Sequence, residues 1–170
     1  MPTAYKSPHL DGAQVATVIA RVAKVGGRTA NLDHRFQVDI YRYDPGCPNI
    51  SFRMTSSGYA GTVWIKERPR EFVVPAGRRI VLKGGWLQDN GSVKSSCTSV
   101  LAFRPENGAT YLYEYAEPSN QTCASNLVEL DLPDGPEGKP EMAPVESLTH
   151  VRTKMGFWGY TADELCTLPP

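Results

Sequence analysis

The stretch CTSVLAFRPENGATYLYEYAEPSNQTC, residues 97–123, carries the strongest indication of the fold. Its two apolar or aromatic runs, SVLAFR and TYLYEY, are separated by PENGA, and a cysteine stands at each end. Gly108 allows the chain to reverse with a positive φ at low cost. We therefore predict a β-hairpin whose second strand carries Tyr111, Tyr113 and Tyr115 on one face. These tyrosines form either a binding ladder or a sheet face covered by the folded-back C-terminal tail.

The same alternation of apolar and polar residues recurs along the chain. In residues 35–43, Phe36, Val38 and Ile40 alternate with more polar neighbours, as in a half-buried strand. Residues 13–25 fit both a helix and a strand, and their β-branched content favours a strand. Asn90-Gly91 is a strong hairpin signal. Further strands are predicted at residues 50–54, 62–66, 71–77, 78–87 and 126–132, with Pro75 at an edge or a turn.

Eight or nine short, evenly spaced strands without a long helix predict one all-β domain, an antiparallel immunoglobulin-like or transthyretin-like β-sandwich. Residues 1–12 form an extended leader, and residues 13–132 form the sandwich itself. Residues 133–144, rich in proline and glycine, form a surface linker. Residues 145–170 form a tail that regains apolar side chains and folds back on the sandwich. We expect a helical turn near its end, with Thr161 as the N-cap.

The chain has four cysteines, and none of them has the spacing of a redox or zinc motif. Each stands beside turn-type residues, in PGCP, SSC, NQTC and ELCTLPP, which favours two disulfides over free core thiols. We predict the pairs Cys97–Cys123 and Cys47–Cys166, one of the three connectivities that four cysteines allow. Disulfides indicate an oxidising compartment, the periplasm or the cell exterior. The N-terminal residues lack the apolar core of a signal peptide, and no stretch is long and apolar enough for a transmembrane helix.

Composition and motifs favour a non-enzymatic protein. The 18 basic and 18 acidic residues balance, which argues against nucleic acid as a partner. His9, His34 and His150 are far apart and form no metal-binding motif, so neither a metal nor a cofactor is predicted. Motifs of serine hydrolases and phosphate-binding loops are absent from the sequence. A hydrolase that uses two carboxylates and a small-ligand carrier remain alternatives.

Two local features suggest a surface that binds another protein. Basic residues gather between positions 66 and 83, and acidic residues gather between positions 114 and 146. They form either two solvated faces or a basic region that docks an acidic partner or the acidic tail. The segment SSGYAGTVW (56–64) offers two aromatic residues among small ones, although its tryptophan is equally suited to filling the core. The candidate partner-binding residues are Tyr59, Trp64, Lys66, Arg68, Arg70, Arg78, Arg79 and Lys83.

Several segments together resemble those of bacterial periplasmic and envelope lipoproteins that contain a small disulfide-bonded β-sandwich. They are DGAQVATVIARV (11–22), SSGYAGTVWIKE (56–67), EFVVPAGRRIVLKG (71–84) and CTSVLAFRPENGATYLYEY (97–115) with Cys123. The resemblance implies a sandwich that faces the periplasm and a lipid anchor on an N-terminal cysteine. This sequence starts at Met1 instead, so membrane attachment through such an anchor is an open expectation.

The resemblance also implies roles in the cell envelope. We expect a non-enzymatic protein-binding or accessory module of the envelope or of a secretion system. An immunity protein that neutralises a secreted antibacterial toxin is the alternative. Either role makes another protein the partner and follows from analogy between folds.

Overall fold

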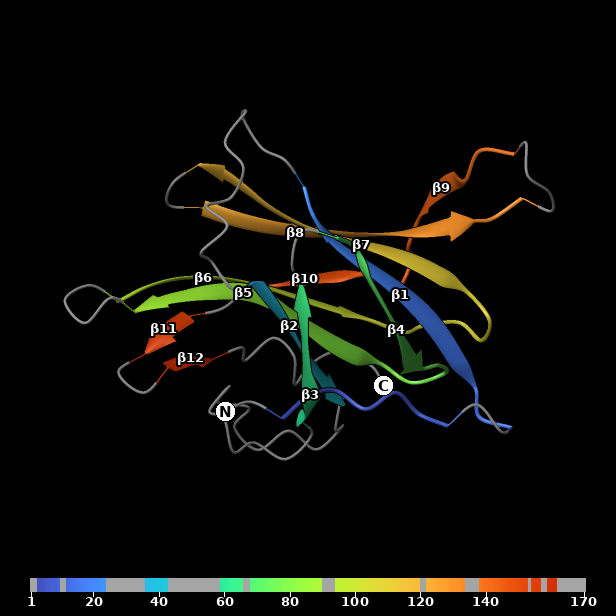
Figure 1. Cartoon of the computed structure of the whole chain (residues 1–170), viewed down its shortest axis with the longest axis horizontal. Helices are drawn as coiled ribbons and strands as arrows, with labels where there is room; N and C mark the ends of the chain where they lie inside the picture. Colours follow the sequence, from blue (N-terminus) through green and yellow to red (C-terminus); the bar gives the residue numbers. More distant parts are fainter. Residues whose placement is uncertain are drawn as a thin grey trace.

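The protein folds into two five-stranded β-sheets that pack face to face, which confirms the predicted all-β sandwich (Figure 1). The structure, a computed structural model, describes residues 3–9, 12–23, 36–42, 59–65, 68–89, 94–119, 122–133, 138–152, 154–156 and 159–161. Sheet A consists, in order, of β10 (Thr149–Val151), β6 (Lys94–Phe103), β5 (Ile80–Asp89), β2 (Phe36–Arg42) and β3 (Tyr59–Ile65). Sheet B consists of β4 (Arg70–Pro75), β1 (Val15–Val22), β7 (Thr110–Ser119), β8 (Thr122–Asp131) and β9 (Glu141–Pro144).

The strand pairs within both sheets are antiparallel except for the parallel pair β1–β7. Two short strands, β11 (Lys154–Gly156) and β12 (Gly159–Thr161), pair with each other in a separate two-stranded sheet.

The alternation in the sequence correctly predicts most of these strands. Residues 13–25 contain β1, in which Ala16, Val18 and Ala20 are buried in the core. The strong turn signal at Asn90-Gly91 lies between β5 and β6, which pair as a hairpin from Asp89 and Lys94 onward. β4, which ends at Pro75, is an edge strand as predicted. The strand expected at residues 50–54 lies outside the described residues.

The predicted hairpin between residues 97 and 115 is wrong, because its two strands belong to different sheets. β6 pairs with β5 and β10, whereas β7 pairs with β1 and β8. Residues 104–109 carry the chain from one sheet to the other, with Gly108 at φ +78°. The amide of Gly108 donates to the carbonyl of Val15, and the side chain of Asn107 accepts from the amide of Val15. The turn is therefore attached to the start of β1 and not to a hairpin partner.

The three tyrosines of β7 fill the core between the sheets, so both the binding ladder and the covering tail are wrong interpretations. Tyr111, Tyr113 and Tyr115 are 1%, 0% and 1% exposed. Phe103 of β6 packs edge-on against Tyr111 with ring centroids 5.1 Å apart, and Phe36 of β2 packs against Tyr115 at 5.3 Å. Sheet A covers these side chains because bulky aromatic groups bury the most apolar area when they face an opposing sheet.

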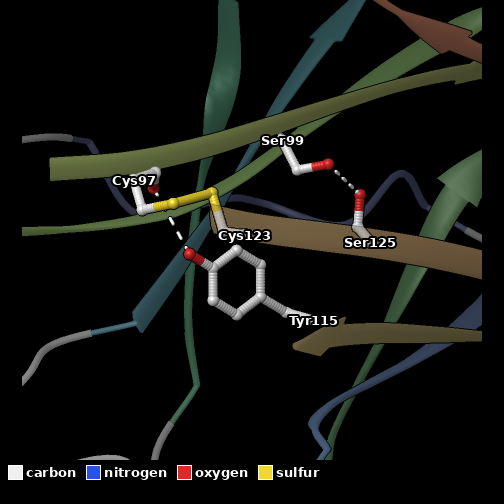
Figure 2. The surroundings of a disulfide bond; sticks show 5 residues. All are labelled: Cys97, Ser99, Tyr115, Cys123 and Ser125. Carbon is white, nitrogen blue, oxygen red and sulfur yellow. Dashed lines mark hydrogen bonds between the residues drawn. A yellow bond between two sulfur atoms is a disulfide. The ribbon is translucent and has the colours of Figure 1, made fainter. Parts of the chain in front are cut away.

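The predicted disulfide between Cys97 and Cys123 is confirmed, and it joins the two sheets. Cys97 lies on β6 and Cys123 on β8, with Cα atoms 5.9 Å apart (Figure 2). It closes a segment with a sequence separation of 26, which the chain-entropy model values at roughly 3.5 kcal/mol. The hydroxyl of Tyr115 donates to the carbonyl of Cys97 beside it (Figure 2). Cys47 and Cys166 lie outside the described residues.

The C-terminal tail returns to the sandwich as predicted, since β10 adds to the edge of sheet A beside β6. Ser147 holds the approach to this strand, because its hydroxyl accepts from the amide of Arg104 and its carbonyl accepts from the guanidinium of Arg79. Within the segment expected to be a linker, Glu141–Pro144 form the exposed edge strand β9. Of the expected helical turn, the structure describes Thr161, which ends β12.

The contact between Gly84 and Tyr113 gives a direct test of the packing of the two sheets. A Cβ atom at Gly84 would lie 1.8 Å from the hydroxyl oxygen of Tyr113 and 3.0 Å from its Cζ. That hydroxyl is also the one buried side-chain polar atom without a hydrogen-bond partner in the described part of the chain. We expect Gly84→Ala to destabilise the protein by about 1–3 kcal/mol through overpacking. Tyr113→Phe removes the unpaired hydroxyl and is expected to be neutral or stabilising by about 1 kcal/mol.

A double-mutant cycle measured by denaturant unfolding tests this prediction. We expect Tyr113→Phe to recover at least half of the loss caused by Gly84→Ala, because the closest contact is removed. Additive effects, within about 0.5 kcal/mol, would contradict the contact across the two sheets.

Candidate functional site

The outer face of sheet A carries a polar network around Asp39. Along β2 the side chains of Phe36, Val38 and Ile40 point into the core, so Gln37 and Asp39 point outward. The strand register places Asp39 between Thr62 of β3 and Lys83 of β5. Asp39 is nevertheless 5% exposed and Thr62 2% exposed, so this carboxyl group depends on nearby donors.

The donors around Asp39 come from three strands. The hydroxyl of Thr62 donates to Asp39 Oδ1 at 2.5 Å. Because its proton is committed there, Thr62 Oγ1 accepts from the hydroxyl of Tyr59, also at 2.5 Å. Gln37 Nε2 lies 3.3 and 3.1 Å from the two carboxylate oxygens, and Lys83 Nζ lies 3.7 Å from Oδ2. This network fixes the side chains of the edge strand β3 to those of the inner strands β2 and β5.

Two tyrosines border the network and stay protonated at neutral pH. Burial raises the pKa of Tyr41, and electrostatic interaction with Asp39 and with the phenol of Tyr59 raises it further. Burial also raises the pKa of Tyr59, its hydrogen bond with Thr62 opposes this shift, and the charge of Asp39 raises the pKa further. The two rings pack at 5.4 Å beside a small apolar cluster that includes Val81 and Val100. Both phenols therefore serve as neutral, positioned side chains.

The structure brings together some of the predicted partner-binding residues. Tyr59 and Lys83 meet in the Asp39 network. Trp64 lies on the same outer face and is partly exposed, while its neighbours Val63 and Ile65 fill the core. The interpretation of Trp64 as a core residue is therefore wrong.

The predicted basic residues do not form one patch. Arg79 is 6% exposed and donates to the carbonyl of Ser147, so it supports the tail. Arg68 and Arg70 are exposed at the start of β4, and Arg78 is exposed in the turn beyond its other end. A six-residue strand separates these positions by about 20 Å. Lys66 lies outside the described residues.

Sequence reasoning missed a second outer face, on sheet B. The register aligns Thr17, Thr110, Leu130 and Met142 in one row, and Ile19, Leu112, Val128 and Pro144 in the next. Met142 and Leu132, which follows β8, are 62% and 54% exposed, and they are the exposed large hydrophobic side chains of the described residues. We name the sheet B face by its residues Ile19, Leu112, Val128, Leu130, Leu132 and Met142.

The position of Cys123 could have indicated which side chains of β8 point outward and form the sheet B face. The disulfide requires Cys123 to point toward sheet A, so Ser125 and Leu127 point inward as well. The alternation of Val128 and Leu130 with Glu129 predicts a strand correctly, but its apolar side is the outer side. On the outer side of the sheet, Arg21 forms an ion pair with Glu114 at 2.9 Å and gives the sheet B face a polar border.

These features define a disulfide-linked all-β sandwich. The outer side of sheet A carries the Asp39 network and a buried apolar cluster, whereas the outer side of sheet B carries exposed apolar side chains. Comparison with known proteins finds no match for the chain among protein-family models, curated proteins or solved structures. Among the residues that the structure describes, no helix is long and apolar enough to cross a membrane. The described ranges also contain no cluster of three or more histidine, cysteine or acidic side chains arranged to hold a metal ion.

The buried phenols predict a loss of stability at alkaline pH. Burial raises the pKa of Tyr5 to about 12, and it also raises the pKa of Tyr41, Tyr59, Tyr111 and Tyr113. The pKa of these phenols is higher in the folded chain than in the unfolded chain, so the folded state keeps its full stability below pH about 10. As the pH rises toward about 12, the unfolded chain ionises more readily than the folded chain, and the free energy of unfolding falls. We expect denaturant unfolding to report falling stability over this window. An ultraviolet titration in which all eight tyrosines of the folded chain ionise near pH 10 would contradict this account.

Proposed function

We propose that this protein is a non-enzymatic module that binds another protein in an oxidising compartment, the bacterial periplasm or the cell exterior. The observation that carries this proposal is the sheet B face, where Met142 and Leu132 stand exposed. Ile19, Val128 and Leu130 of this face are partly exposed, whereas Leu112 is buried. Contiguous exposed apolar side chains on a small domain are typical of interaction sites.

The make-up of the sheet B face supports a protein partner. Its aliphatic centre is bordered by the Arg21–Glu114 ion pair and by Asn126, the arrangement of apolar centre and polar rim found at protein interfaces. Met142 brings a flexible, polarisable side chain that adapts to a partner surface.

The edge strand β9 is poorly suited to pair with a strand of a partner, which favours contact through the sheet B face. β9 is flanked by Pro140 and ends at Pro144, and proline has no amide proton to donate to an added strand. A partner therefore approaches the side chains of the face and not the backbone of this edge.

The disulfide supports the proposed location in an oxidising compartment. Cys97–Cys123 ties the two sheets at a partly buried position beside Tyr115. Structural disulfides of this kind form and persist in oxidising compartments.

Site-specific photo-crosslinking in the native cells tests the proposed function. A photoreactive amino acid at Met142 is expected to give one discrete cross-linked product. The same group at Arg78, which is exposed and belongs to the basic set, is the matched control and is expected to give none. Leu132→Glu places a charge at the exposed end of the sheet B face and is expected to lower the cross-linked yield at least about tenfold. A product at position 78 but none at 142 would contradict the choice of surface, and no product at either position would contradict the function.

A further inference from the structure

The N-terminal segment Thr3–Tyr5 lies along the free edge of β3 as a very short added strand. The amide of Tyr5 donates to the carbonyl of Thr62, and the amide of Thr62 donates to the carbonyl of Thr3, each at 2.9 Å. These bonds form a single parallel bridge between Ala4 and Thr62. The segment therefore occupies an edge of sheet A.

The side chain of Tyr5 reaches from sheet A to sheet B. Its ring packs edge-on against Phe72 of β4 with centroids 5.9 Å apart. Its hydroxyl donates to the carbonyl of Val73 at 2.8 Å, on the edge strand of sheet B. Tyr5 thus donates one hydrogen bond to a backbone carbonyl of each sheet, at the edge strands β3 and β4.

Gly61 makes this edge suitable for another backbone. A Cβ atom at Gly61 would lie 2.6 Å from Tyr5 Cα and 2.8 Å from Tyr5 N, closer than any side chain allows. The residue also has φ +138°, which disfavours other residue types. The edge of β3 therefore has a position where a second chain can approach at backbone contact distance.

The resident segment uses a small part of this edge. Along a strand, every second residue directs its backbone groups to the same side, so Trp64 presents its amide and carbonyl on the same edge as Thr62. After Tyr5 the chain leaves the edge, and Lys6, Ser7 and His9 are exposed. Within the described part of the chain, a longer strand in the same direction gains backbone hydrogen bonds to Trp64 that Thr3–Tyr5 do not make.

We propose that the edge of β3 together with Phe72 and Val73 is a strand-accepting site for a partner protein. The partner supplies an extended segment that runs parallel to β3 and places a tyrosine in the position of Tyr5. The N-terminal segment of this chain is the resident occupant and competes with the partner at the high effective concentration of a tethered ligand. This site is separate from the sheet B face and does not depend on it.

Peptide binding to a full-length variant tests the site. Tyr5→Pro removes the amide donor, the ring and the hydroxyl of the resident segment in one substitution. The probe is a fluorescent peptide with the sequence of residues 3–9, TAYKSPH. We expect saturable binding to the Tyr5→Pro chain that is at least about tenfold tighter than binding to the wild-type chain. A control peptide with alanine in place of the tyrosine is expected to bind at least about tenfold more weakly, since it lacks the ring and hydroxyl contacts.

Each other outcome overturns the proposal. A folded Tyr5→Pro chain, checked by circular dichroism, that binds neither peptide or binds both equally has no such site. Tyr5→Ala keeps the amide and serves as the second variant if the proline variant does not fold. Loss of folding in both would show that the segment is an integral strand and not an exchangeable one. A wild-type chain that dimerises with concentration, and a Tyr5→Pro chain that does not, would identify a second copy as the occupant in place of a separate partner.

Discussion

The packing of the β7 tyrosines against sheet A is the contact on which the rest of the structure depends. Tyr111 and Tyr115 each meet an aromatic ring of the opposing sheet, and Tyr113 lies against the backbone of Gly84. Phe103 of β6 meets Tyr111 of β7 across the core because the chain crosses from one sheet to the other after β6. The disulfide between Cys97 and Cys123 then closes the same interface from β6 to β8. The alternation of the strands leaves Leu112, Val128 and Leu130 on the outside of sheet B.

The two open sides of the sandwich are closed in different ways. On one side the edge strands β9 and β10 follow each other in the chain, and Ser147 between them bonds to Arg79 and Arg104. On the other side the edges of β3 and β4 are linked by the side chain and backbone of Tyr5. Among the described residues, the first closure is built from continuous chain, whereas the second consists of the segment Thr3–Tyr5. This difference is the reason why the second side is the one suited to exchange.

Local pattern predicted the strands, the sandwich and one disulfide, because each depends on residues close in sequence or on residue type. The crossing after β6 was not predictable in this way, since PENG serves a hairpin and a crossover equally well. For a similar reason the sequence did not indicate that the described basic residues lie apart from one another. Arg78 and Arg79 are neighbours in the chain, yet one is exposed and the other buried, because they stand in a turn between sheets. Tyr59 and Lys83 meet only through the register of β2, which non-local pairing determines.

Backbone nuclear Overhauser effects between strands test whether the chain crosses from one sheet to the other after β6. If it does, contacts are expected in parallel register between Thr17–Val22 of β1 and Thr110–Tyr115 of β7, together with side-chain contacts between the rings of Phe103 and Tyr111. An antiparallel ladder of backbone contacts between β6 and β7 would contradict this crossing. That result would place both strands in one sheet and would remove the basis for the two outer faces described above.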